Sequence, residues 1–168
     1  MKTKILLIAL LVISVKSMAQ EFSKGTIITC RYDTISDVDI KNVSDFKSLL
    51  QITYIDKNGN EQKPAIESIK CYTRGNDTFT RIYNSGEMIM VKKIVAGPKL
   101  NLYERNYNGL TIHYIEKVYD ELIKVPSSSS KFKKVIGDFL SNSQAVSHQI
   151  SSENNSDIKE LVDLYNKG

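Results

Sequence analysis

The chain has 168 residues, with 23 basic and 19 acidic side chains and a formal net charge of +4. Three of the lysines, Lys2, Lys4 and Lys16, lie in the first nineteen residues, so the remainder has 20 basic and 19 acidic side chains and a net charge of +1. Because nucleic-acid binding needs a concentrated positive surface, this balance argues against a nucleic-acid partner.

The first nineteen residues have the three parts of a secretory signal peptide. Lys2 and Lys4 supply positive charge, residues 5–15 are an apolar run, and Ser17 and Ala19 are the small residues expected at a cleavage site. The apolar run is much shorter than the roughly 20 residues that a membrane-spanning helix needs. We therefore predict that residues 1–19 are removed on export. The mature chain should have no stable membrane span and should be periplasmic or secreted.

The mature chain, residues 20–168, has the length of one ordinary domain. We predict a single domain with a β-rich part at residues 20–126 and a helical part at residues 127–168. Cys30 and Cys71 are its only cysteines. In an exported chain they have one available pairing, so they form either a disulfide or two separate thiols, and the sequence leaves both alternatives open.

From residue 24 to residue 125, short β-branched and aromatic runs alternate with turn dipeptides, which is typical of antiparallel strands joined in hairpins. Asn58-Gly59 and Asn108-Gly109 are the strongest turn signals, because both central residues of a type I′ turn need positive φ. Since a large sheet twists and must protect its edges, we expect the meander to curl into a roll or partial barrel. The predicted strands lie at about residues 25–31, 35–40, 49–56, 66–73, 78–84, 87–95, 100–107, 110–117 and 119–125.

The pattern changes after Pro126, where apolar residues recur at helical spacing from Phe132 to Leu140. A second helix is predicted to begin at Asp157, whose side chain can cap it. Between them, residues 145–150 are expected to form a short third helical turn. The predicted fold class is therefore α+β, an antiparallel meander followed by two to three C-terminal helices packed on it.

Three segments carry a resemblance: Lys24 to Thr29, Asp33 to Ile35 and, after a β-rich middle, Leu161 to Asn166. In this arrangement the chain resembles a group of exported proteins, common in Bacteroidetes, that has no established activity. The Ala19-Gln20 junction is similar to the signal-peptide ends usual in that phylum. In that group the first turn commonly reads Gly-Asp-Thr, whereas here Tyr32 precedes Asp33. The resemblance implies export and leaves function open.

Two groups of acidic and amide side chains are candidate cation sites. Asp56, Asn58, Asn60 and Glu67 have the spacing of ligands in a calcium loop. Gly59, however, is at the fourth position of that loop, which needs glycine at the sixth, and the flanks are predicted strands, so a hairpin turn is favoured. The pair Asp37 and Asp39 is interpreted as solvated edge protection rather than an acid–base pair.

The remaining chemistry-bearing residues are scattered. His113 and His148 are the only histidines and have no His-Glu or His-Cys pairing nearby, so no zinc site is predicted. There is no Gly-x-Ser-x-Gly elbow for a catalytic serine. Lysines 131, 133 and 134 are interpreted as the solvated face of an amphipathic helix. We predict no catalytic, cofactor-binding or metal-ligating residues and no cofactor.

Tyrosines are concentrated in the predicted strands, and Tyr103 and Tyr114 flank one hairpin, across which we expect them to pair. A tyrosine has an apolar body and a polar tip, which suits recognition as well as a core. Tyr103, Tyr114 and His113 are therefore the candidate residues of a recognition face.

Together these patterns predict an exported, non-catalytic binding or interaction module of the cell envelope, whose partner is an unidentified envelope protein or small ligand. Two alternatives remain open: a carrier of a small apolar ligand inside the β roll, and an envelope hydrolase. A carrier needs an internal apolar cavity. A hydrolase needs His113 or an acidic pair converging in a cleft.

Overall fold

The computed structural model describes residues 21–118, 120–152 and 157–168. The predicted signal peptide at residues 1–19 lies outside these ranges, as does Tyr119. Within them, no helix combines the length and the hydropathy needed to cross a bilayer. The chain divides into two compact units, the first ending at Arg81 and the second running from Ile82 to Gly168.

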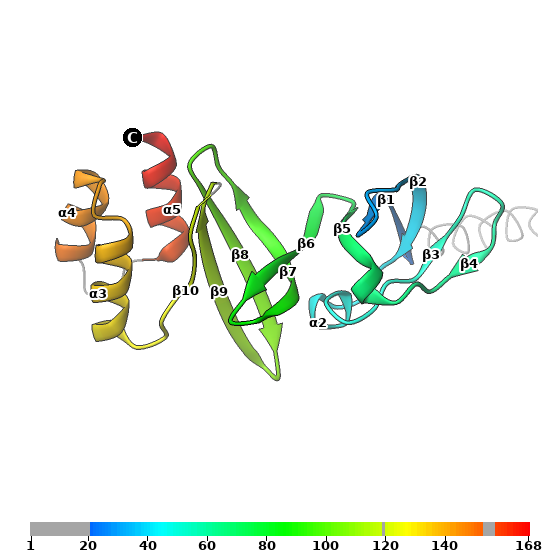
Figure 1. Ribbon diagram of the computed structural model, residues 1–168, viewed down its shortest axis with the longest axis horizontal. Coiled ribbons are helices and arrows are strands. Elements are labelled where there is room, and N and C mark those ends of the chain that lie inside the picture. Colours follow the sequence, from blue (N-terminus) through cyan, green and yellow to red (C-terminus); the bar gives the residue numbers. More distant parts are fainter. Residues whose placement is uncertain (1–20, 119, 153–156) are drawn as a thin grey trace, which may run out of the picture. The chain divides into compact units, whose positions relative to one another are not determined.

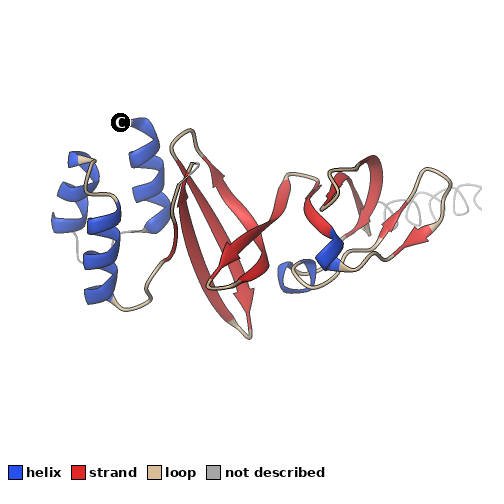
Figure 2. Cartoon of the chain, in the orientation of Figure 1, coloured by secondary structure: helices blue, strands red, loops and turns tan. Residues whose placement is uncertain are grey.

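Over the described ranges, ten strands form an antiparallel sheet in the order β10-β9-β8-β7-β6-β5-β1-β2-β3-β4, and helices follow it in the chain (Figures 1 and 2). The α+β class is therefore confirmed. The order has two end strands, β4 and β10, so the sheet is open rather than a closed barrel. The strands are β1 (Phe22–Thr29), β2 (Thr34–Lys41), β3 (Tyr54–Ile55), β4 (Glu61–Gln62), β5 (Ile69–Arg74), β6 (Asp77–Asn84), β7 (Glu87–Ala96), β8 (Leu100–Tyr107), β9 (Leu110–Lys117) and β10 (Leu122–Lys124). The helices are α2 (Asp45–Ser48), η1 (Ile66–Ser68), α3 (Ser129–Phe139), α4 (Gln144–Ser152) and α5 (Ile158–Lys167).

In the first unit, β1 pairs with β2 on one side and with β5 on the other, and β5 pairs with β6. Tyr72 of β5 stacks on Phe79 of β6 with ring centroids 4.7 Å apart, and its hydroxyl donates to the carbonyl of Ser48 at 2.7 Å. Arg74, only 8% exposed, donates to Ser48 Oγ at 2.7 Å and to the Val43 carbonyl at 3.0 Å. These bonds fix the segment around α2 against the strands.

The predicted strand at residues 49–56 is wrong over most of its length. Ser44 caps the short helix α2 by accepting from the Lys47 N–H, and the strand β3 occupies Tyr54–Ile55 only. The apolar residues of this segment are nevertheless in the core, since Leu49, Ile52 and Tyr54 are buried. The segment therefore contributes to the core without the extended conformation that was predicted for it.

A hairpin turn at Asn58-Gly59 is confirmed, although its second strand, β4, was not predicted and the turn is not type I′. Gly59 has φ +81°, while Asn58 is not in the left-handed region. The Asp56 carboxylate accepts from the backbone N–H groups of Asn58 and Asn60 at 2.9 Å each, which holds the turn in another conformation. At Asn108-Gly109, by contrast, both φ angles are positive, +50° and +76°, as the type I′ prediction requires.

In the second unit, the register of β8 and β9 separates two faces of the sheet. Tyr103 lies directly opposite Tyr114, which confirms their predicted pairing. One face carries these two tyrosines, which pack with Ile82, Ile89 and Val91. The other face carries Leu100, Leu102 and Ile115. Because successive strand residues point to opposite faces, this sheet can have a core on each side.

The helices α3, α4 and α5 pack on the face that carries Leu100, Leu102 and Ile115. Burial of a large apolar side chain contributes roughly 1.5–3 kcal/mol, so this shared core is a main source of the unit's stability. The predicted short turn at residues 145–150 is a nine-residue helix, α4. The Asp157 cap of α5 is confirmed, because its side chain accepts from the Lys159 N–H at 2.8 Å. The helical residues of this core are Ile136, Phe139, Leu140, Val146, Ile150, Ile158, Leu161, Val162 and Tyr165.

Candidate functional site

The predicted recognition face of Tyr103, Tyr114 and His113 is not a single surface. Tyr103 and Tyr114 are 3% and 2% exposed and belong to the core. His113 is opposite Glu104 in the register and lies on the other face of the sheet. The prediction failed because a strand alternates its side chains, so residues 113 and 114 cannot face the same way.

Neither histidine lies in a catalytic arrangement. His113 Nε2 is 3.3 Å from Glu104 Oε2, in a pair that is partly exposed. His148 is exposed on α4. Over the part of the chain that the structure describes, no cluster of three or more His, Cys, Asp or Glu side chains could hold a metal ion.

No disulfide joins Cys30 to Cys71 in the structure. Cys30 is exposed, and its backbone N–H donates to the Ser68 carbonyl, whereas Cys71 is opposite Ile28 in the register of β1 and β5. The Cys30 thiol donates to the Glu67 carbonyl at 3.4 Å. For the oxidised chain, the disulfide stays one of the two alternatives that the sequence leaves open.

Asp56 organises a turn rather than a calcium loop. Hydrogen bonds from the Asn60 and Asn58 backbone hold the pKa of its carboxyl below its usual value, with a further bond from the Gln62 side chain. The carboxylate is thereby occupied by donors of its own hairpin. Of the acidic strand pair, Asp37 is exposed and Asp39 forms an ion pair of 2.8 Å with Lys24.

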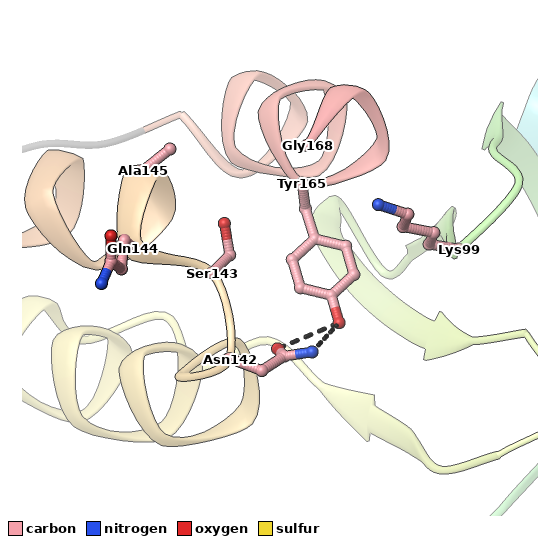
Figure 3. A pocket seen from close by; sticks show the side chains of 7 residues that line it. All are labelled: Lys99, Asn142, Ser143, Gln144, Ala145, Tyr165 and Gly168. Atoms are coloured by element: carbon pink, nitrogen blue, oxygen red, sulfur yellow. Dashed lines mark hydrogen bonds between the residues drawn. The ribbon is translucent and has the colours of Figure 1, made fainter.

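The main candidate site is a pocket of about 680 Å³ in the second unit (Figure 3). Three segments that are far apart in the sequence meet there: the turn between β7 and β8, the connection from α3 to α4, and the end of α5. Its lining is predominantly polar. The lining residues are Lys99, Asn142, Ser143, Gln144, Ala145, Tyr165 and Gly168.

Tyr165 joins α5 to the α3–α4 connection. Its hydroxyl exchanges two hydrogen bonds with the Asn142 side chain: Asn142 Nδ2 donates to Tyr165 Oη at 2.9 Å, and Tyr165 Oη donates to Asn142 Oδ1 at 3.1 Å (Figure 3). The tyrosine is 7% exposed and shares the core with Leu161 and Val162. Core packing of α5 therefore fixes one wall of the pocket.

Asn166, the next residue of α5, joins the helix to the β7–β8 turn. Its Oδ1 accepts from the backbone N–H groups of Lys99 at 3.1 Å and Leu100 at 2.9 Å, and its Nδ2 donates to the Leu100 carbonyl at 2.9 Å. A Cβ atom at Gly97 would lie 2.1 Å from Asn166 Nδ2, so only glycine admits the amide at this position. This contact fixes the opposite wall and the backbone of Lys99.

Three polar side chains of the pocket have bonding capacity left over. Among the residues that the structure describes, the Lys99 ammonium and the Gln144 amide have no hydrogen-bond or ion-pair partner, and the Ser143 hydroxyl accepts only from the Val146 N–H at 3.5 Å. Lys99 is the one charged side chain in the lining. A ligand that enters would therefore meet donors and the positive charge of Lys99, together with the main-chain carboxyl of Gly168.

A second pocket of about 550 Å³ lies in the same unit, between the β6–β7 turn and β10, with Tyr83, Glu116 and Asp120 among its lining residues. Glu116 Oε2 accepts from the Tyr103 hydroxyl at 2.5 Å and from Asn101 Nδ2 at 3.2 Å. Burial, and then the bond to Glu116, raise the pKa of Tyr103 above its ordinary value. This wall is thus a core hydrogen-bond network that ends in a partly exposed carboxylate.

Sequence reasoning missed the main pocket. Its residues come from positions 99, 142–145, 165 and 168, which no local motif connects. The available signal was the closing Leu161 to Asn166 segment, whose last two residues tie the walls together. No protein-family model, curated protein or solved structure matched the chain when it was compared with them.

Proposed function

We propose that this chain is an exported, non-catalytic binding module that takes a small polar ligand in the pocket of its second unit. The observation that carries the proposal is the pocket itself, in which Lys99, Ser143 and Gln144 have unused bonding capacity among the described residues. Its volume of about 680 Å³ lies within the range of roughly 300–1,000 Å³ found for small-molecule sites.

Binding is favoured over hydrolysis because the pocket lining lacks the parts of a nucleophile–base pair. Its hydroxyl groups are those of Ser143 and of Tyr165, the second of which is bonded to Asn142, and neither histidine belongs to the lining. An activated serine needs a base within hydrogen-bond reach. His113 is instead paired with Glu104 on β8.

We also propose that β6 to β10 curl into the roll predicted from the sequence. Ile82 of β6 and Leu122 of β10, on opposite edges of these five strands, pack in one cluster, which supports the curl. The cluster is filled by large side chains, with Tyr103 and Tyr114 at its centre. This packing disfavours the alternative of an apolar cargo inside the roll.

Export remains part of the proposal and is supported by the composition of residues 1–19 and by the resemblance to exported Bacteroidetes proteins. A periplasmic or secreted binding module would meet small ligands and envelope proteins in that compartment.

The function is tested with the mature chain, residues 20–168, by thermal-shift and native mass spectrometry against a library of small polar metabolites. A ligand of this pocket should raise the melting temperature and add mass to the native ion. In Ala145→Trp, the indole fills the pocket and both signals should disappear. The matched control is His148→Trp, which adds the same group to the same helix at a residue outside the lining.

Absence of binding across the library would contradict the proposed function. Equal binding by wild type and Ala145→Trp would contradict its location.

A further inference from the structure

We infer that the pocket recognises an oxyanion group, such as a carboxylate or a phosphate, through the ammonium of Lys99, and that Asn166 is the positioning residue for Lys99. The inference rests on the proposed function, because it names the ligand class of the same pocket. It is carried by the charge of the lining, by the lack of intramolecular partners and by the Asn166 contact.

The charge of the lining favours an anion. Among the described residues, the side chains that line this pocket include Lys99 and no acidic side chain, and the main-chain carboxyl of Gly168 is also in the lining. The second pocket has the opposite character, with Glu116 and Asp120 beside Lys124. A charge-assisted hydrogen bond from an ammonium to an oxyanion is about twice as strong as a neutral one, so Lys99 gives the pocket a preference for anions.

Some exposed lysines elsewhere on the chain have acidic partners, unlike Lys99. Lys24 pairs with Asp39 at 2.8 Å, Lys63 with Glu61 at 2.6 Å and Lys159 with Asp163 at 3.3 Å. Lys99 has no such partner among the described residues, and its side chain extends toward Tyr165 from the β7–β8 turn (Figure 3). An entering oxyanion would therefore not have to displace an acidic side chain.

Asn166 determines where Lys99 stands. Its amide binds the backbone on both sides of the Lys99–Leu100 peptide and leaves the lysine side chain unobstructed. The lysine side chain is exposed and has four methylene groups, so it is flexible. If the β7–β8 turn were flexible as well, the ammonium would occupy a larger volume, and ordering it would raise the entropic cost of binding. Fixing the backbone lowers that cost without touching the ligand.

The test is isothermal titration of the mature chain with inorganic phosphate and, separately, with citrate, at low and constant chloride concentration. Wild type should bind at least one of these probes. Lys99→Met should weaken binding about tenfold or more, because it removes the charge-assisted bond. The matched control is Lys159→Met, which removes an exposed lysine of α5 outside the lining and should stay within about twofold of wild type.

The positioning role is tested by Asn166→Ala alone and in the Lys99→Met background, with melting temperatures recorded for each variant. Asn166→Ala should weaken probe binding in the wild-type background and have no further effect once Lys99 is gone. A merely structural role would lower binding, or folding, equally in both backgrounds. If Asn166→Ala does not fold, Gly97→Ala replaces it, since a Cβ at residue 97 displaces the same amide.

The outcomes separate the two proposals. If neutral library ligands bind but neither phosphate nor citrate does, the anion inference is overturned and the proposed function stands. If no ligand binds at all, the proposed function fails first. If Asn166→Ala is folded and binds the probes as wild type does, Lys99 keeps its role and the positioning role is refuted.

Discussion

At the scale of single residues, the first turn contains a side chain in a backbone conformation that favours glycine. Tyr32 has φ +68°, and its N–H donates to the Thr29 carbonyl at 3.0 Å. The tyrosine therefore stands at a position that glycine would occupy without strain. Its exposed ring gains a contact from Lys70, whose Nζ is 4.1 Å from the centroid.

Tyr32→Gly should therefore stabilise the chain, by about 0.5–1 kcal/mol, because glycine adopts positive φ without the Cβ penalty. The measurement is the free energy of unfolding in urea. Arg31→Gly is the control, since Arg31 does not have positive φ, and it should lower stability by a similar amount. Destabilisation by Tyr32→Gly would mean that the Lys70 contact outweighs the backbone strain.

Two buried tyrosines give the chain a dependence on alkaline pH. Burial raises the pKa of Tyr72 and of Tyr103 well above the ordinary value, which is about 10. Below about pH 10 both states hold these protons and pH has no effect through them. Above it, the unfolded state releases protons that the folded state retains, so stability falls as pH rises.

The slope should reach about 1.4 kcal/mol per pH unit for each tyrosine. Urea unfolding between about pH 9 and pH 12 measures it. Tyr72→Phe, in the first unit, and Tyr103→Phe, in the second, should each remove the contribution of one tyrosine to the fall of the unfolding free energy with pH. Slopes identical to wild type in both variants would show that these hydroxyls do not cause the loss.

At the scale of elements, the contact between α5 and the β7–β8 turn is an interlocking pair. Asn166 fills the space that the missing Cβ of Gly97 leaves, and it satisfies the backbone groups of Leu100, which is itself buried. Leaving a buried backbone group without a partner costs about 1–3 kcal/mol. The pair should therefore be strongly coupled.

Asn166→Ala should destabilise the chain by about 2 kcal/mol. Gly97→Ala should have a similar cost because it expels the amide. In the Asn166→Ala background, Gly97→Ala should cost much less, with a coupling energy of about 1–3 kcal/mol. A double-mutant cycle by urea denaturation measures this coupling, and additive effects would refute the interlock.

Elements with a local signal were predicted from the sequence, and those without one were not. Asn108-Gly109 marked a real hairpin, since positive φ is a requirement of the two residues themselves. The Asp157 cap was equally local. The α2 segment was missed because its apolar residues suited a strand as well as a loop tied down by Arg74, which is 26 residues away from its partner Ser48.

The pocket could not be predicted for the same physical reason. Asn166 and Leu100 are 66 residues apart, and Tyr165 and Asn142 are 23 apart. Such side-chain contacts depend on how α5 packs on the sheet. No local sequence pattern around a helical asparagine identifies a hydrogen-bond partner that is far away in the chain. The candidate recognition face, conversely, failed on a local rule, the alternation of strand side chains.

At the scale of the whole molecule, removal of the predicted signal peptide determines the mass of the mature chain. The chain recovered from its host envelope should begin at Gln20, since Ser17 and Ala19 provide the cleavage-site residues. Intact mass spectrometry without reducing agent measures the start of the chain. A mass that still includes residues 1–19 would contradict removal of the segment.

The Asn166 contact also restricts how the sequence can evolve. The amide of this one side chain acts toward Leu100 as a peptide group of a neighbouring strand would, by donating to its carbonyl and accepting from its N–H. Any residue larger than glycine at position 97 would occupy the space that the Asn166 amide fills. Positions 97 and 166 should therefore change together in related chains, so an alignment could detect the docked helix from covariation without a structure.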